Sequence, residues 1–150
     1  MGLIGKLSGN LTQGILGNLN EKGIDELNRE YGPYLMDNES IETGFILIRD
    51  AVIFTDKRIL SFDKQGATGS KMRLKSINLD SIIDVTAETA GFGFDDSEIT
   101  ITFITSPFFK ASSGVSLDSK QFEFPKKYNI QPIYKMLQTI AYDNLQRING

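Results

Sequence analysis

Three short apolar runs separated by very short gaps are the feature that most constrains the fold of this chain. The runs cover residues 45–48, 51–54 and 59–62, and two to four residues lie between neighbouring runs. A connection between parallel strands needs about a dozen residues or more, which such gaps cannot hold. The sequence therefore predicts an antiparallel meander, in which each strand pairs with the next.

Turn-forming residues occupy the gaps, and further strands follow. Arg49-Asp50 and Asp56-Lys57 lie in the first two gaps, and residues 65–70 (QGATGS) form a longer connection that contains glycine. From residue 97 to residue 105 apolar and polar side chains alternate strictly, which is typical of a strand with one solvent-exposed face. With the apolar patterns at residues 72–79, 82–89 and 122–124, the sequence predicts seven strands.

Helices are predicted on both sides of the strand region. Residues 24–35 form a helical piece that is broken at Gly32-Pro33. Near the C-terminus, Asn129 is a candidate N-cap, and Pro132 lies in the first helical turn, where proline is tolerated. Apolar residues then recur three or four positions apart, which predicts an amphipathic helix that covers the exposed end of the strands. They are Ile130, Ile133, Tyr134, Leu137, Ile140, Ala141 and Leu145.

Several motifs resemble those of the bacterial pleckstrin-homology-like domain family. They are residues 47–50 (LIRD), 54–58 (FTDKR) and 63–71 (DKQGATGSK), with further matches at 88–91 (ETAG) and 124–127 (FPKK). The resemblance implies a mainly β fold, namely a seven-stranded antiparallel PH-like barrel or sandwich capped by a C-terminal α-helix. We therefore expect residues 1–34 to form a helical N-terminal extension and residues 35–150 to form the PH-like domain.

The first 23 residues carry an apolar face of their own. Leucine and isoleucine side chains at positions such as Leu3, Leu7, Leu11 and Ile15 are three or four residues apart, although glycines interrupt the pattern. We favour docking of this face on the domain or on a neighbouring subunit. A helix on a membrane surface and disorder in isolation are the open alternatives. The segment lacks the charged start and continuous apolar core of a signal peptide.

Composition excludes several kinds of enzyme. The chain has no Cys and no His, so disulfides, structural zinc, Cys nucleophiles and imidazole catalysis are all excluded. No nucleophile and base are paired in any motif, so we predict a non-enzyme without catalytic, cofactor-binding or metal-binding residues. Residues 95–98 (DDSE) lack the ligand spacing of a calcium loop, and a solvated loop is favoured there over a calcium site. The net charge of −3 argues against nucleic-acid binding.

Charge is segregated along the strand region. Residues 57–75 contain one acid and six bases, whereas residues 76–105 contain six acids and no base. Three interpretations are open: cross-strand pairing within one subunit, an interface between oppositely charged subunit surfaces, and an anionic ligand on the basic side. The candidate interface or anion-binding residues are Lys57, Arg58, Lys64, Lys71, Arg73 and Lys75.

Two classes of function follow from these observations. The first is a non-catalytic assembly or interaction module that forms a ring-like homo-oligomer, as the resemblance implies, in a role linked to membrane or envelope stress. The second is a binding protein for an anionic lipid headgroup or peptide. We do not expect phosphoinositide binding, because the connection at Arg49-Asp50 is too short to form a basic pocket. A further protein partner and membrane association are left open, and a cytoplasmic location, at most peripheral to the membrane, is expected.

Overall fold

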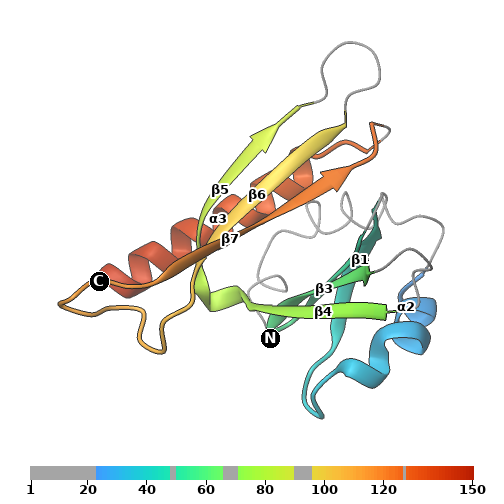
Figure 1. Cartoon of the computed structure of the whole chain (residues 1–150), viewed down its shortest axis with the longest axis horizontal. Helices are drawn as coiled ribbons and strands as arrows, with labels where there is room; N and C mark the ends of the chain where they lie inside the picture. The colour runs from blue at the N-terminus through green and yellow to red at the C-terminus, as the bar shows by residue number, and fades with distance from the viewer. Residues whose placement is uncertain (1–22, 48–49, 66–70, 90–95, 127) are drawn as a thin grey trace. The chain divides into compact units, whose positions relative to one another are not determined.

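The computed structural model describes residues 23–47, 50–65, 71–89, 96–126 and 128–150 (Figure 1). Within these residues the predicted seven strands, the early helical piece and the C-terminal helix are confirmed. In chain order the elements are α2 (Ile24–Tyr31), η2 (Gly32–Tyr34), β1 (Ile41–Ile46), β2 (Asp50–Thr55), β3 (Arg58–Gln65), β4 (Lys71–Asn78), η3 (Leu79–Ser81), β5 (Ile82–Glu88), β6 (Ser97–Ile104), β7 (Leu117–Phe124) and α3 (Gln131–Asn149).

The strands form two sheets, each an antiparallel meander as predicted. One sheet has the order β1-β2-β3-β4 and the other the order β5-β6-β7. The chain divides into two compact units, of which the N-terminal one ends at Ser76 and the C-terminal one covers Ile77–Gly150. The expected boundary between residues 34 and 35 stays a prediction, and the apolar face within residues 1–22 lies outside the described residues.

The expected PH-like barrel or sandwich is confirmed as a fold of two separate sheets, and the strands of the described residues do not close into a barrel. A barrel requires a hydrogen-bond ladder that continues all the way round. Here β4 is followed by the single turn η3, which satisfies its own backbone groups: the Ile82 N–H donates to Leu79 O, and the Ser81 hydroxyl donates to Asn78 O at 2.7 Å. The ladder therefore stops at β4 and starts again at β5.

Helix α2 covers one face of the N-terminal sheet. Its Leu27 and Tyr31 join a buried cluster that includes Ile53 and Phe62 from the strands. Gly44 in β1 permits this close approach, since a Cβ atom there would lie 2.8 Å from Ile53 Cδ1 and 3.2 Å from Leu27 Cδ1. The short helix is thus held by burial of its apolar face, because eight residues alone would not form a stable helix.

Helix α3 packs along β5 and lies behind the C-terminal sheet in Figure 1. The predicted stripe is confirmed in part: Leu145 is 37 % exposed, while Asn144 is buried in the position next to it. The predicted N-cap is wrong: the helix begins at Gln131 and its N-cap is Ile130, which makes no side-chain cap bond, although Asn129 Oδ1 accepts the Gln131 N–H at 3.1 Å. The buried residues of α3 are Ile133, Met136, Leu137, Ile140, Ala141 and Asn144.

The buried Asn144 amide joins α3 to the turn η3. Its Nδ2 donates to Leu79 O and to Ile82 O, both at 2.7 Å. Arg147 Nη2 adds bonds to Asp80 O at 3.0 Å and to Asn144 Oδ1 at 3.1 Å. One side chain therefore satisfies carbonyls on both sides of the turn, where water has little access.

We predict that Asn144→Ala lowers the free energy of unfolding by about 2–3 kcal/mol, because it removes the buried side-chain donor that the Leu79 and Ile82 carbonyls share. Asn149→Ala is the matched control, since that amide is exposed and donates only to Leu145 O in its own helix. Urea denaturation monitored by circular dichroism measures both variants. Equal stability of the two variants would contradict the role given to Asn144.

Candidate functional site

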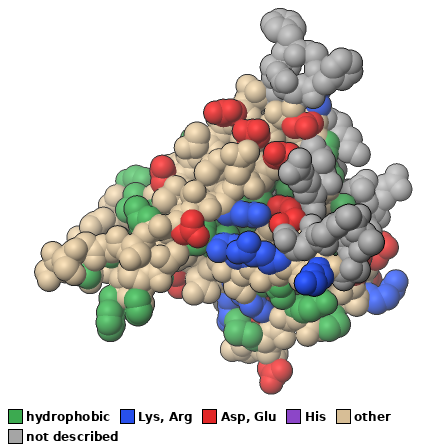
Figure 2. Space-filling model, in the orientation of Figure 1, with side chains coloured by type: hydrophobic (Ala, Val, Ile, Leu, Met, Phe, Trp, Pro, Cys, Tyr) green, Lys and Arg blue, Asp and Glu red, His purple; other side chains and the backbone are tan. Residues whose placement is uncertain are grey.

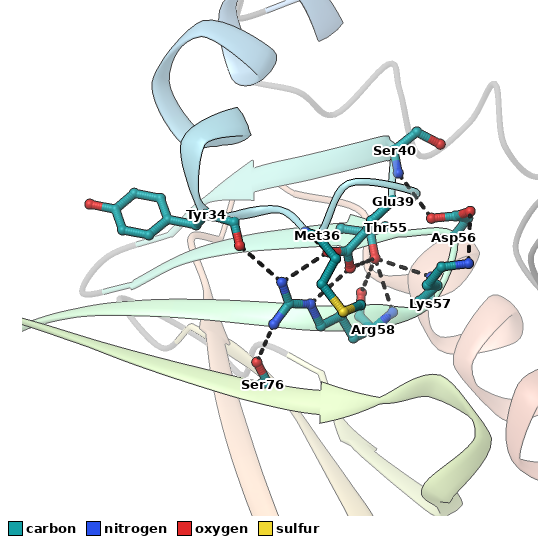
Figure 3. Close-up of polar contacts among 9 residues, drawn as sticks. All are labelled: Tyr34, Met36, Glu39, Ser40, Thr55, Asp56, Lys57, Arg58 and Ser76. Carbon is teal, nitrogen blue, oxygen red and sulfur yellow. Dashed lines mark hydrogen bonds and ion pairs between the residues drawn. The ribbon is translucent and has the colours of Figure 1, made fainter.

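A buried ion pair between Glu39 and Arg58 dominates the polar chemistry of the N-terminal unit (Figure 3). The Glu39 side chain has no exposed surface, and that of Arg58 is largely buried. The guanidinium meets the carboxylate as a fork, with Nε 2.8 Å from Oε2 and Nη2 2.9 Å from Oε1. Two parallel charge-assisted bonds of this kind fix orientation as well as distance.

Further donors complete the surroundings of the Glu39 carboxylate. The Thr55 hydroxyl donates to Oε2 at 2.6 Å, and the Met36 N–H donates to Oε1 at 3.0 Å. The Thr55 oxygen in turn accepts the N–H groups of Lys57 and Arg58, at 3.1 Å and 3.0 Å. The turn between β2 and β3, which the sequence predicted at Asp56-Lys57, is therefore built around the same carboxylate.

The remaining donors of Arg58 bind two other segments of the unit. Nη1 donates to Ser76 Oγ at 2.7 Å, at the end of the unit, and Nη2 donates to the Tyr34 carbonyl at 2.9 Å. The guanidinium thus spans η2, β3 and β4 (Figure 3). An external anion would have to compete with these partners, so we assign Arg58 a structural role.

The electrostatic environment keeps Glu39 ionised. Burial alone would raise the pKa of this carboxyl, but hydrogen bonds from Arg58, Thr55 and the Met36 N–H, together with the charge of Arg58, lower the pKa to about 2. A carboxylate that is ionised and fully bonded neither donates nor removes a proton near neutral pH. The pair therefore stabilises the fold and is not a catalytic acid or base.

A second carboxyl, Glu42, is half-buried at a bulge in β1. It is the extra residue between Ile41 and Thr43, whose partners Thr55 and Phe54 are adjacent in β2. Burial and the charge of Asp56 raise the pKa of Glu42, and its Oε2 has no hydrogen-bond partner. The protonated, neutral form of Glu42 is therefore favoured more than usual. Asp56, whose charge contributes to this shift, accepts a hydrogen bond from the Ser40 N–H and lies 3.7 Å from Lys57 Nζ.

Buried hydroxyls do not form a catalytic pair. Thr43 Oγ1 and Ser61 Oγ are buried without a hydrogen-bond partner, so no base contacts either one. Both lie on one face of the sheet, because Thr43 is opposite Phe54 and Ser61 is opposite Val52 in β2. Within the described residues, no three acidic, His or Cys side chains gather to hold a metal ion. Also within them, no helix is long and apolar enough to cross a membrane.

The predicted basic residues separate into paired and exposed groups. Lys57 and Arg58 pair with Asp56 and Glu39, neither of which belongs to the acidic segment 76–105. The side chain of Lys64 lies outside the described residues. Lys71 and Arg73 are exposed on β4, and Lys75 is half-buried with a contact inside the chain.

Strand β4 presents an alternating surface at the edge of the N-terminal sheet. It is the last strand in the order β1-β2-β3-β4. Lys71 and Arg73 have the same parity along the strand, while Met72 and Leu74 have the other parity and are 52 % and 38 % exposed. We call residues 71–74 the basic edge.

The C-terminal sheet has one face that is polar along most of its strands, and we call it the acidic face. Alternation along β5 and β6 places mainly apolar residues inside and polar residues on the opposite face, which ends in the paired apolar residues Ile104 and Leu117. The polar residues are Asp84, Thr86, Glu88, Glu98, Thr100, Thr102, Ser119, Gln121 and Glu123. In Figure 2 acidic side chains are spread over this sheet, and basic side chains gather over the N-terminal one.

Three glutamates stand in one row across this face. Glu88 is directly opposite Glu98, and Glu98 is directly opposite Glu123. Neighbouring strands are about 4.8 Å apart, and like charges placed directly opposite destabilise a sheet. The sequence indicated the outward direction of Glu98, but it did not indicate this row, because the row depends on the register of three strands.

The comparisons with known proteins agree with this architecture. A family model described as "Bacterial PH domain" matches residues 10–141. The chain belongs to the bacterial PH domain family. The uncharacterised protein YjqA of Bacillus subtilis (strain 168) is 35 % identical to it over 128 residues, which cover 85 % of this chain and 95 % of the relative.

Solved structures of other bacterial PH domains are similar in fold. A PH domain from Shewanella amazonensis SB2B has a TM-score of 0.61 and 29 % identity, over 86 % of this chain and 96 % of that one. A protein with a PH domain from Shewanella loihica PV-4 has a TM-score of 0.55 and 30 % identity, over 80 % and 94 % of the two chains. The recognised family is thus confirmed, whereas none of these descriptions states an activity.

For this bacterial PH domain we predict that Glu39→Gln lowers the free energy of unfolding by about 2–4 kcal/mol at pH 7, because Arg58 loses its buried counter-charge. The folded-state pKa of Glu39 lies below its usual value, so the unfolded chain binds the extra proton first as the pH falls. The stabilisation is present above about pH 4.5 and is lost towards about pH 2. The difference between wild type and variant should therefore shrink across that window.

Glu26→Gln is the control for this prediction, since Glu26 is exposed on α2. Denaturant unfolding at a series of pH values measures all three proteins. A difference between wild type and Glu39→Gln that stays constant down to pH 2 would contradict the assignment.

Proposed function

We propose that this bacterial PH domain is a non-catalytic assembly module that forms a ring-like homo-oligomer through two unlike surfaces. The observation that supports the proposal is the opposite charge of the basic edge and the acidic face. Lys71 and Arg73 are exposed on the one, and Glu88, Glu98 and Glu123 share a row on the other. Neither Lys71 nor Arg73 has an ion-pair partner among the described residues.

Unlike surfaces favour a head-to-tail arrangement. When two subunits join through different patches, the pair still has one free patch of each kind. Further subunits can therefore add, and the row of subunits closes into a ring when the rotation from one subunit to the next allows it. Two copies of the acidic face would repel each other across a two-fold axis. A basic edge placed on the acidic face would instead relieve the repulsion within the glutamate row.

The charges would guide association more than they would hold it together. Exposed ion pairs contribute little to affinity, and they mainly set encounter rate and orientation. Apolar contacts have to supply most of the binding free energy, and the exposed Met72 and Leu74 on the basic edge can make such contacts. The N-terminal apolar face of residues 1–23 is a second candidate supplier, which lies mostly outside the described residues.

The absence of catalysis is part of the same proposal. The most buried carboxylate, Glu39, is fully bonded, and the buried hydroxyls of Thr43 and Ser61 have no base beside them. Binding of an anionic headgroup or peptide to Lys71 and Arg73 is the alternative. Assembly is favoured because the same chain supplies the complementary acidic surface. A link to membrane or envelope stress remains an expectation.

We predict particles of several subunits in light scattering after size exclusion at low salt. The double variant Lys71→Glu, Arg73→Glu should be largely monomeric, and so should Glu88→Lys, Glu98→Lys, because each places like charges at the contact. Mixing the two variants should restore large particles, since the reversed surfaces complement each other. Lys135→Glu, at an exposed position on α3, is the control and should assemble normally.

A monomeric wild type at micromolar concentration in low salt would end the assembly proposal. A monomer that binds anionic vesicles through Lys71 and Arg73 would favour the alternative function. Large particles that are unaffected by both double variants would keep assembly but reject these two surfaces.

A further inference from the structure

The connection between β6 and β7 carries exposed apolar side chains that no part of the proposed assembly uses. It covers residues 105–116, with the sequence TSPFFKASSGVS. Phe108 is 75 % exposed, the highest value among the large apolar side chains of the described residues. Pro107 and Val115 in the connection are exposed as well, and so is Leu117, the first residue of β7. We call this connection the aromatic loop.

Four hydrogen bonds link residues of the aromatic loop to one another. The Thr105 N–H donates to Ser116 O at 2.9 Å and closes its base. The Ser106 hydroxyl donates to Phe108 O at 3.0 Å and accepts the Ser116 N–H at 3.4 Å. Gly114 turns the returning arm with a φ of 93° and donates to Ala111 O at 3.1 Å. The Phe108 carbonyl is therefore held by a hydrogen bond while its side chain is exposed.

The charge of this region differs from that of the rest of the chain. Between Glu98 and Asp118 there is no acidic residue, and Lys110 is the single base. Asp118 comes directly after the loop, and its Oδ1 accepts the Ser119 N–H at 2.8 Å. A loop with apolar side chains, one lysine and no acidic residue suits an anionic surface, because it carries no negative charge that the surface would repel.

The area of the loop argues for lipid rather than for a protein partner. A stable protein interface needs about 800 Å² on each side, with matching shape. The aromatic loop is a single connection of 12 residues that extends past the ends of β6 and β7 in Figure 1, whereas a standard interface takes about 20–30 residues on each side. A bilayer requires no matching surface, since apolar side chains enter it to a shallow depth while the lysine stays at the headgroups.

We propose that the aromatic loop is a membrane-contact site, in which Phe108 enters the outer part of an anionic bilayer and Lys110 binds lipid phosphates. This inference does not depend on ring formation, because the loop lies outside both the basic edge and the acidic face. One aromatic side chain gives weak and reversible contact, and several copies in one particle would strengthen it.

The absence of tryptophan from the chain allows a direct test. Phe108→Trp places one fluorophore on the loop, and Met36→Trp places one at an exposed position in the N-terminal unit. With phosphatidylglycerol vesicles, emission from Phe108→Trp should shift to the blue and be quenched by lipids brominated on the acyl chain. Emission from Met36→Trp should not change.

Two further variants separate the apolar and the ionic parts. Phe108→Ser should bind these vesicles about tenfold more weakly in co-sedimentation. Lys110→Glu should weaken binding to phosphatidylglycerol vesicles more than binding to phosphatidylcholine vesicles. Both positions are exposed, so unchanged thermal unfolding is expected and excludes misfolding as the cause.

Three results would overturn the proposal. The first is an unchanged Phe108→Trp spectrum at a large excess of lipid. The second is emission that is already blue-shifted without lipid in an assembled particle, which would place the loop against a second copy of the chain. The third is equal vesicle binding by wild type and Phe108→Ser.

Discussion

The N-terminal unit depends on the ion pair between Glu39 and Arg58, because the pair joins segments that are distant in sequence. Its hydrogen bonds reach the Tyr34 carbonyl before the first strand, Thr55 at the turn after β2, and Ser76 at the end of the unit. A buried charge without its partner is strongly destabilising, so each group requires the other. The same bonds that lower the pKa of Glu39 thus fix the entry to β1 and the turn between β2 and β3.

A second polar contact has a corresponding role in the C-terminal unit. Asn144 is buried in the apolar stripe of α3 and satisfies the carbonyls of Leu79 and Ile82. These carbonyls lie on both sides of the turn at which one sheet ends and the other begins. In both units, then, a few buried polar groups fix the geometry of a turn, while apolar packing supplies the bulk of the stability.

Membership of the bacterial PH domain family defines the architecture of this chain but not its activity, because the same fold serves many functions. Function has to be argued from the surfaces. The basic edge and the acidic face have opposite charge and lie in different units, which supports assembly of like subunits through unlike patches. The aromatic loop has neither charge pattern, and its exposed Phe108 supports a separate contact with lipid.

The sequence alone determined the strand order and the helices, because both depend on local patterns. Short gaps required a meander, alternation in residues 97–105 assigned the faces of β6, and the apolar periodicity after Pro132 indicated the last helix. The family motifs were also readable at this level. Such features involve residues close together in the chain, so that turn chemistry and side-chain periodicity are sufficient to predict them.

Only the tertiary structure decided which polar residues matter. Glu39 gave no local signal, since its partner Arg58 is 19 residues away and the two meet through the pairing of β1 with β2 and the turn into β3. The glutamate row of Glu88, Glu98 and Glu123 requires the register of three strands, and a shift of one residue would turn each side chain to the other face. The sequence left barrel and sandwich open for the same reason: closure of the ladder depends on where hydrogen bonds stop. At Leu79–Ser81 the backbone bonds to itself instead of to a neighbouring strand, so the sheets stay separate.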